Sequence, residues 1–201
     1  MKLATEPYEQ QSRRWPPEGR HILAHFDETS VVVYQAYRPS IGRFAIEHGF
    51  LGGPDFSYAR MSWIKPNFLW MMYRSGWGTK PGQEVILGLR IARRFFDELL
   101  QRAVPSTHDP ERFPDHAAWK SAVVASEVRL QWDPDHAPSG QKLARRAIQL
   151  GLRGATLEAY AKREILEVID LSAFVASQRS GLEHRAAGLL TPVERVYPPR
   201  G

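Results

Sequence analysis

Cationic and aromatic side chains alternate through the segment RMSWIKPNFLWMMYRSGWGTKPGQ, which runs from Arg60 to Gln83. Its cations are Arg60, Lys65, Arg74 and Lys80, and its aromatic side chains are Trp63, Phe68, Trp70, Tyr73 and Trp77. Fixed positive charge attracts phosphate or carboxylate groups, and ring faces stack on planar ligands. The segment therefore predicts one wall of a site for an anionic ligand that contains rings.

Helical geometry is expected to separate these cations. Pro66 fits the first turn of a helix that is predicted to run to about Arg74. Lys65 and Arg74 stand nine residues apart, about two and a half turns, so they would lie on opposite sides of a straight helix. The helix dipole favours Arg74 at the C-terminal end, which is a structural explanation for that residue. Lys65, beside the N-terminal end, is the stronger candidate for binding an anion.

Another cationic candidate follows a strand. The segment SVVVYQAYR is rich in β-branched and aromatic residues and predicts a strand from about Val31 to Tyr37. Arg38 comes next, and a guanidinium there can bind phosphate or carboxylate through two parallel hydrogen bonds. A surface salt bridge explains Arg38 equally well. The candidate cofactor-binding residues are therefore Tyr37, Arg38, Ser62, Trp63, Lys65, Arg74 and Trp77.

Candidate catalytic groups lie on a third strand, which is predicted from Glu127 to Trp132. Glu127 or Asp133 would act as a general base or stabilise a cationic transition state, and Gln131 lies between them. The sequence Asp133-Pro134-Asp135 is also common in turns and is predicted to close the strand. The sequence leaves open which carboxylate is catalytic.

Composition narrows the class of protein. The 201 residues are 43% hydrophobic and 24% charged, with a formal net charge of +5, and this basic excess favours nucleotides or nucleic acid as partners. The chain has no cysteine, and its histidines lack ligand spacing within a predicted helix, so we expect no metal site. It has neither an apolar run of about 18 residues nor a signal-peptide core, so we expect a cytoplasmic protein without membrane contacts.

Strands and helices are predicted to alternate, with no short turn between strands. The predicted strands are Val31–Tyr37, Glu84–Ile91 and Glu127–Trp132, and Glu164–Leu171 is predicted to be a fourth strand or a helix-to-strand hybrid. The main predicted helices are Ile41–His48, Pro66–Arg74 and Ala92–Ala103. This pattern predicts one α+β domain over residues 1–201, with a small, mostly antiparallel or split sheet flanked by helices. Residues 1–19 and 180–201 are predicted to be an irregular lead-in and an irregular tail.

Four sequence blocks resemble a known family. The blocks VYQAYRPSIGRFAIEHG, MSWIKPNFLWMMYRSGWGTKPGQE, VRLQWDPDH and AIQLGLRG are similar to the signature blocks of a widespread domain family of unknown function that is found in bacteria and fungi. The resemblance covers most of the chain, roughly Val31 to Phe174, and its long central block is highly specific. It implies no established activity.

The order of elements is also similar to that of the ADP-ribosyltransferase superfamily. The shared order is a strand ending in Arg, a short helix ending in His-Gly, a strand before an aromatic-rich helix, and a later strand with a carboxylate. The block KPNFLWMMY resembles the NPRNPMLY-like block of the DNA-modifying DarT-type toxins, and SEVRL resembles the strand that bears their catalytic glutamate. The superfamily's usual His or Ser-Thr-Ser elements have no unambiguous counterpart in this chain.

This second resemblance implies that NAD is the substrate and that ADP-ribose is transferred to protein or nucleic acid. It implies that Arg38 holds the NAD phosphates, that the aromatic helix stacks on nicotinamide, and that Glu127 orients the acceptor or the ribose. Asp133 would serve equally well as Glu127, and Ser62 would take the second-strand position. Cleavage of the bond to nicotinamide passes through an oxocarbenium-like centre, which a nearby carboxylate stabilises.

Two other interpretations remain open. In one, the protein is a nucleic-acid-binding or RNA-processing module in which tryptophans stack on bases and Lys65, Arg74 and Lys80 contact phosphates. In the other, it is a structural protein whose aromatic side chains all belong to the core. Burial separates them, because full burial of Trp63, Trp70 and Trp77 with no basic cleft beside them would exclude the stacking hypothesis.

Overall fold

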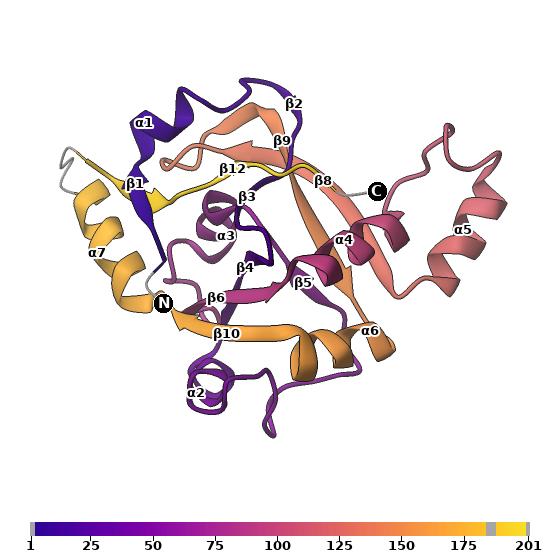
Figure 1. Ribbon diagram of the computed structural model, residues 1–201, viewed down its shortest axis with the longest axis horizontal. Coiled ribbons are helices and arrows are strands. Elements are labelled where there is room, and N and C mark those ends of the chain that lie inside the picture. The colour runs from indigo at the N-terminus through magenta and orange to yellow at the C-terminus, as the bar shows by residue number, and fades with distance from the viewer. Residues whose placement is uncertain (1–2, 184–187, 200–201) are drawn as a thin grey trace.

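The protein is described here by a computed structural model that covers residues 3–183 and 188–199. Two larger β-sheets and a two-stranded ribbon are surrounded by helices (Figure 1). Most strand pairs are antiparallel, and helices and strands follow one another in mixed order along the chain. The α+β class expected from the sequence is confirmed.

The first sheet is antiparallel throughout and has the strand order β10-β6-β4-β3-β12. Its strands are β3 (Leu23–Phe26), β4 (Ser30–Tyr37), β6 (Val85–Ala92), β10 (Ile165–Asp170) and β12 (Arg195–Val196). On β4, Val31 and Val33 pack into one hydrophobic cluster, whereas Val32 and Tyr34 pack into another. Burial on both faces explains the unbroken run of β-branched and aromatic residues from which this strand was predicted.

The second sheet is built on a long hairpin and has the order β2-β9-β8-β7, with β5 also paired to β9. Its strands are β2 (Gly19–Arg20), β5 (Ser62–Ile64), β7 (Val104–Pro105), β8 (Val128–His136) and β9 (Lys142–Leu152). Lys65, directly after β5, forms an isolated antiparallel bridge with Tyr34 of β4. The segment from Ser62 to Lys65 therefore links the two sheets.

Helices pack around the sheets and form several of the connections between strands. They are α1 (Tyr8–Ser12), α2 (Pro39–His48), α3 (Phe68–Ser75), α4 (Arg93–Arg102), α5 (His116–Ala125), α6 (Gly154–Ala159), the π-helix η1 (Tyr160–Glu164) and α7 (Ser172–Glu183). The two-stranded ribbon pairs β1 (Thr5–Pro7) with β11 (Leu190–Pro192). Within the described ranges, no helix has both the length and the apolar character that crossing a membrane requires.

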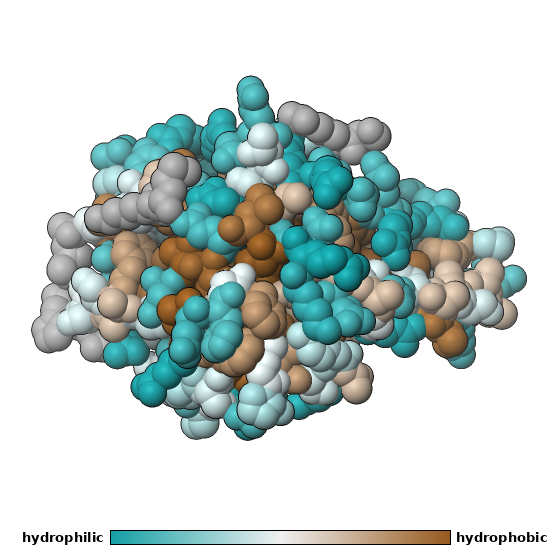
Figure 2. Space-filling model, turned by 60° about the horizontal axis from the view of Figure 1, so that its bottom comes forward, coloured by the Kyte–Doolittle hydropathy of each residue, from teal (hydrophilic) through white to brown (hydrophobic). Residues whose placement is uncertain are grey.

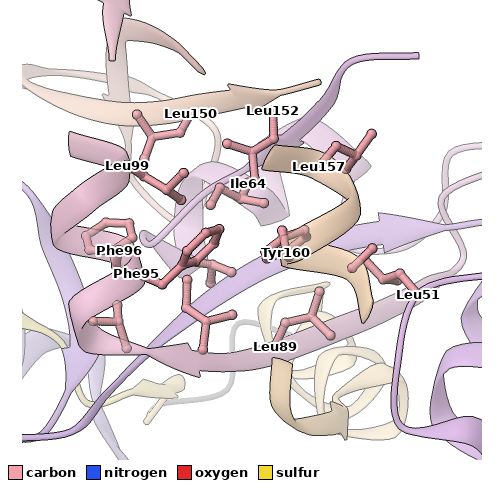
Figure 3. Packing of buried hydrophobic residues seen from close by; sticks show 14 of the residues in the cluster. Leu51, Ile64, Leu89, Phe95, Phe96, Leu99, Leu150, Leu152, Leu157 and Tyr160 are labelled. Atoms are coloured by element: carbon pink, nitrogen blue, oxygen red, sulfur yellow. The ribbon is translucent and has the colours of Figure 1, made fainter. Parts of the chain in front are cut away.

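The main hydrophobic core combines residues of both sheets with α4, α6 and η1. Leu89, Phe96, Leu150, Leu157 and Tyr160 are fully buried in it and point toward one another (Figure 3). A second core lies on the other face of the first sheet, where α3 packs against β4 and α7. Because α3 is buried against β4, its position relative to the end of that strand is fixed by packing.

Two predictions are corrected in the β8–β9 region: that Asp133-Pro134-Asp135 closes the third strand, and that no short turn joins two strands. β8 does not end at Asp133-Pro134-Asp135 but runs on to His136, and it turns into β9 through a short loop. Proline has no N–H to give to a ladder, and the register shifts between Pro134 and His136. The sequence Asp133-Pro134-Asp135 is typical of a turn and gives no sign of the register shift that accommodates Pro134 within the strand.

The two ends of the chain contain helices and strands, although they were predicted to be irregular. Residues 1–19 include β1 and α1, and residues 180–201 include β11 and β12. Gln11 joins them, because its Nε2 donates to the Thr191 hydroxyl at 2.9 Å and its Oε1 accepts from the backbone N–H of Glu194 at 2.8 Å. Backbone pairing between distant segments depends on the whole fold, so local composition gave no signal for it.

One face of the molecule has a gathering of hydrophobic residues at its centre within a largely hydrophilic surface (Figure 2). Among large hydrophobic side chains, Leu166 of β10 is 58% exposed and Val124 of α5 is 74% exposed. Single exposed apolar side chains such as Leu166 and Val124 are normal on soluble proteins.

Candidate functional site

A cleft of about 540 Å³ opens where the ends of β4 and β5 meet α3 and the β8–β9 hairpin. A cavity of this size is in the range of small-molecule and cofactor sites. We call it the basic cleft, and its lining residues are Gln35, Ala36, Tyr37, Arg60, Met61, Ser62, Trp63, Lys65, Met71, Arg74, Gln83, Gln131 and Gln149. Among the predicted site residues, it brings together Tyr37, Ser62, Trp63, Lys65, Arg74 and Gln131.

Lys65 is 4% exposed and lines the basic cleft. Hydrogen bonds in both directions with Tyr34 of β4 fix its backbone, at 2.7 and 3.4 Å. In the described part of the chain, Nζ has no hydrogen-bond or ion-pair partner, and the centre of the Trp70 ring lies 6.0 Å from it. A buried cation without a counterion is costly, so an anionic ligand here would be strongly favoured.

The protonation of Lys65 is set by its surroundings. The pKa of the Lys65 amine is lowered to about 8, mainly by burial and also by the positive charge of Arg74, whereas the Asp133 carboxylate acts in the opposite direction. Desolvation disfavours the charged form of an amine, which accounts for the direction of the main effect. Both the ammonium and the neutral amine are therefore accessible near neutral pH.

Arg60 and Arg74 line the same cleft as Lys65, which corrects the prediction that helical spacing keeps Lys65 and Arg74 apart. The reason is that α3 begins at Phe68, so Lys65 lies in extended chain before the helix and not on its surface. Lys80 lies apart, because its Nζ donates to the carbonyl oxygen of Arg74 at 2.8 Å. Cations often bind the last carbonyls of a helix in this way.

A hydrogen-bonded network of neutral groups forms one side of the cleft. Gln35 Nε2 donates to Ser62 Oγ at 2.8 Å and to the carbonyl oxygen of Trp63 at 3.2 Å, and Gln35 Oε1 accepts from the Tyr160 hydroxyl at 2.8 Å. The Tyr37 hydroxyl lies 3.2 Å from Ser62 Oγ. Burial raises the pKa of both tyrosine hydroxyls. The network is therefore uncharged and holds Ser62 in a fixed position.

Asp133 lies behind two amides that line the cleft. Gln131 Nε2 donates to Asp133 Oδ1 at 2.8 Å, and Gln149 Nε2 donates to Asp133 Oδ2 at 2.7 Å. Gln131 and Gln149 are paired across β8 and β9, so they lie on one face of the hairpin. The carboxylate is half-buried and does not itself line the basic cleft, but it fixes the amide groups of two residues that line the cleft together with Lys65.

Glu127, the other candidate catalytic carboxylate, has a different position. Its Oε1 accepts from the backbone N–H of Ala155 at 3.0 Å, and its Oε2 accepts from the N–H and hydroxyl of Thr156 at 3.0 and 2.7 Å. The hydrogen bond from the Thr156 side chain is the main cause that lowers the pKa of Glu127. A carboxylate at the first turn of α6 satisfies N–H groups that have no partner within the helix. Glu127 does not line the basic cleft.

Arg38 follows β4 as predicted and is exposed. It lines a smaller cleft of about 220 Å³, which shares Tyr37, Arg60, Met61 and Ser62 with the basic cleft. The two clefts are therefore neighbours, and Arg38 lies beside the basic cleft and not in it.

The three tryptophans do not form a single platform. Trp63 is half-buried in the basic cleft, and its ring lies so close to Gly151 that an added Cβ would be 3.0 Å from it. Trp70 is buried. Trp77 packs edge-on against Phe68 and lines a separate cavity of about 360 Å³. The prediction that Trp77 shares one site with Lys65 is corrected, and Trp63 alone among the three lines the basic cleft.

The start of α3, three residues after Lys65, is held by a buried carboxyl group. Glu194 is 2% exposed; it accepts from the backbone N–H of Phe68 at 2.7 Å and from Asn67 Nδ2 at 3.2 Å. Asn67 is also the N-cap of α3, because its Oδ1 accepts from the backbone N–H of Trp70 at 2.7 Å. Burial raises the pKa of Glu194 well above its usual range. The C-terminal segment thus helps to position the chain that carries Lys65.

Sequence reasoning missed Gln35, Gln149, Tyr160 and Glu194. Gln35 had a signal in the sequence, because it is a polar residue within an apolar strand. In the structure its side chain is only 4% exposed. Gln149 lies in a segment whose sequence indicates amphipathic character without fixing its partner. Tyr160 and Glu194 reach the region only through the tertiary fold, so no local pattern identifies them.

The described residues contain no group of three or more His, Cys, Asp or Glu that could hold a metal ion. The site is instead a cleft of cations, amides and hydroxyls at the link between two sheets. The chain belongs to a family described as a domain of unknown function (DUF4291), whose family model matches residues 21–197. All lining residues of the basic cleft lie inside this range. A search of curated proteins finds no match.

Proposed function

We propose that the basic cleft binds an anionic, nucleotide-like ligand. The observation that supports this most directly is Lys65, a buried amine that lines the cleft and has no hydrogen-bond or ion-pair partner in the described chain. Arg60 and Arg74 add positive charge to the same cleft, and guanidinium groups suit phosphate through paired hydrogen bonds. Amide and hydroxyl groups beside them suit the hydroxyls of a ribose.

We further propose that the ligand is NAD and that the protein is an ADP-ribosyltransferase-like enzyme. The basic cleft and the smaller cleft of Arg38 share four residues, and a dinucleotide is long enough to occupy two adjoining sites. Arg74 and Lys65 bind the pyrophosphate in this proposal, and Arg38 contacts the more distant nucleotide. Trp63 stacks on nicotinamide, which is the aromatic contact that the geometry of the cleft favours.

Asp133 is the carboxylate that this proposal assigns to the reaction. The bond between ribose C1′ and the nicotinamide nitrogen breaks, and nicotinamide leaves with the bonding electrons. The positive charge that develops at C1′ is stabilised by a carboxylate fixed nearby. An acceptor oxygen or nitrogen then bonds to C1′ and releases its proton to water. Asp133 is supported over Glu127 because its partners line the cleft, whereas those of Glu127 belong to α6.

Thermal unfolding in the presence of NAD, ADP-ribose and nicotinamide tests the binding step. A ligand present at about 100 times its Kd stabilises a protein by about 2.7 kcal/mol, so a Tm increase with NAD and ADP-ribose but not with nicotinamide alone is expected. Arg74→Ala should reduce that increase, whereas Lys120→Ala, at an exposed site on α5, should not. No increase with any phosphate-bearing ligand would contradict the proposal. Release of nicotinamide from NAD tests the reaction itself.

A nucleic-acid ligand is a second candidate, and it is favoured by one observation. Trp63 is half-buried in the same cleft as Lys65 and Arg74, an arrangement that suits one stacked base with adjacent phosphates. Because Trp70 and Trp77 do not line this cleft, the expected site holds a single base. Quenching of tryptophan fluorescence by a short single-stranded oligonucleotide, lost in Trp63→Leu, would support this candidate over NAD.

A further inference from the structure

Lys65 differs from every other lysine in the described part of the chain. Lys80, Lys120, Lys142 and Lys162 are all exposed. Lys80 donates to backbone carbonyls, and Lys162 Nζ pairs with Glu158 at 2.7 Å. Lys65 alone in this set is buried, and its Nζ has neither a hydrogen bond nor an ion pair within the described residues. It is therefore a buried amine that lines an open cleft.

The surroundings of Lys65 make the neutral amine more accessible than it is for a surface lysine. Burial and then Arg74 on α3 lower the pKa of Lys65 to about 8, while Asp133 on β8, hydrogen-bonded to its two glutamines, opposes them. Arg60 adds a further positive charge to the same cleft. An amine that is desolvated and placed next to another cation is activated as a nucleophile, which is how lysines that attack carbonyl groups are prepared.

We propose that Lys65 is a nucleophile that forms an imine with the open-chain aldehyde of a sugar phosphate bound in the basic cleft. Arg74 and Arg60 bind the phosphate, and the amides of Gln131 and Gln149 bind sugar hydroxyls. The proposal names a ligand class and a covalent step that nucleotide binding does not require. It needs the cleft to admit an anionic ligand, but it does not need that ligand to be NAD.

The covalent step balances without a further reactant. The lone pair of Nζ attacks the aldehyde carbon, and the carbonyl oxygen takes up the proton that the nitrogen loses, which gives a carbinolamine. Loss of that hydroxyl group as water, together with the second proton of the nitrogen, leaves the carbon–nitrogen double bond. The reaction is reversible, and hydrolysis of the imine restores the lysine and the aldehyde.

Reductive trapping tests the proposal on the wild-type protein. The protein is incubated with ribose 5-phosphate and sodium cyanoborohydride at pH 7.5, and each lysine is assayed by peptide mass spectrometry. The expected result is an adduct on Lys65 that forms at least tenfold faster than on Lys80, Lys120 or Lys142. An unmodified Lys65 beside labelled surface lysines would overturn the proposal, and this internal comparison does not depend on whether a variant folds.

Two controls define the chemistry. Ribose without phosphate should label Lys65 at least tenfold more slowly, because it lacks the group that Arg74 binds; an equal rate would overturn the assignment of a sugar phosphate. Ribitol 5-phosphate, which has no aldehyde, should give no adduct and should slow the labelling by competition. Labelling of Lys65 by the alcohol would mean that the adduct is not an imine and would also overturn the proposal.

The outcome can be separated from that of the proposed NAD site. A phosphate held at Nζ keeps the amine protonated, so saturating NAD is expected to protect Lys65 from labelling. If labelling is fast and NAD has no effect on it, nucleotide binding in this cleft is contradicted while imine formation stands. If NAD raises the Tm but Lys65 is not labelled, nucleotide binding is supported and imine formation by Lys65 is contradicted.

Discussion

Two carboxylates at the two ends of one short stretch of chain have different surroundings. Glu127, just before β8, accepts hydrogen bonds from the backbone and a hydroxyl of α6. Asp133, within β8, accepts from the side chains of Gln131 and Gln149, which line the basic cleft. Both carboxylates are hydrogen-bonded, but the partners of Glu127 form a helix terminus and those of Asp133 form the wall of a cleft.

The partners of a carboxylate therefore indicate its role better than its place on a strand does. Glu127 satisfies N–H groups that the helix leaves unpaired, so its removal should cost stability. Asp133 orients two amides and acts on the charge of Lys65, so its removal should change the cleft. Substitution of Glu127 should therefore affect mainly the stability of the fold, and substitution of Asp133 should affect mainly the properties of the cleft.

The largest effect is expected for Asp133→Asn. Loss of a fixed negative charge at the developing cation should lower nicotinamide release from NAD by about 100-fold or more, which is typical for removing one preorganised electrostatic group. Kinetic measurement of kcat, with Tm as a check on folding, compares this variant with Glu127→Gln. The assignment of the reaction to Asp133 would be contradicted if Glu127→Gln abolished nicotinamide release and Asp133→Asn did not.

Lys65→Met should stabilise the protein at pH 7 by about 3 kcal/mol, because a pKa of about 8 in place of 10.5 means that folding buries a charge at a cost of about 1.4 kcal/mol per pKa unit. Between pH 8 and 10.5 the unfolded chain binds the extra proton, so wild-type stability rises with pH and the advantage of the variant shrinks. Chemical unfolding at pH 7 and pH 10 measures both. Lys120→Met, on the exposed surface of α5, should show no such advantage.

The same measurement connects Lys65 to Asp133. Because the Asp133 carboxylate raises the pKa of Lys65, the gain from Lys65→Met should be larger in an Asp133→Asn background. Equal gains in both backgrounds would mean that the two groups do not interact.

Glu127→Gln should lower the free energy of unfolding by about 1 kcal/mol, the usual loss when a helix-terminal acceptor is weakened, and should leave ligand binding in the basic cleft unchanged. Since the folded pKa of Glu127 is lowered, its contribution is full above the unfolded pKa and is lost as the pH falls through the folded value. Unfolding curves at several pH values below 7 should therefore show the difference between wild type and variant shrinking as the pH falls through the lowered pKa of Glu127. A loss of the same size at every pH would exclude an ionised cap.

The smallest effect is expected for Arg38→Ala. Arg38 is exposed and lies in the neighbouring cleft, so stability should change by less than about 0.5 kcal/mol. Affinity for NAD, measured by calorimetry, should fall by a few fold, because the contact is with the outer part of the ligand. A large loss of stability with unchanged affinity would assign Arg38 a structural role.

Local patterns predicted several of the strands and helices. The strand at Val31–Tyr37 and the helix at Ile41–His48 are present as β4 and α2, and the third strand exists as β8. These elements have periodic burial, and burial follows directly from side-chain type. The β8–β9 hairpin was not predicted, because Pro134 resembles a strand end when the register shift that accommodates it is unknown.

The candidate site was predicted in composition but not in geometry. Lys65 and Arg74 were identified, yet their convergence depends on α3 starting at Phe68 and not at Pro66. A difference of two residues at a helix start decides which side chains share a cleft. Boundaries depend on capping partners, and one of these, Glu194, is supplied by a distant segment.

The position of Glu194 late in the sequence also affects when the start of α3 can be completed during protein synthesis. Glu194 lies 126 residues after Phe68, and synthesis adds about 5–20 residues per second. The helix beside Lys65 therefore waits on the order of ten seconds on the ribosome before its buried acceptor has been made. During translation the cleft is among the last parts of the molecule to be finished, although most of its own residues are made early.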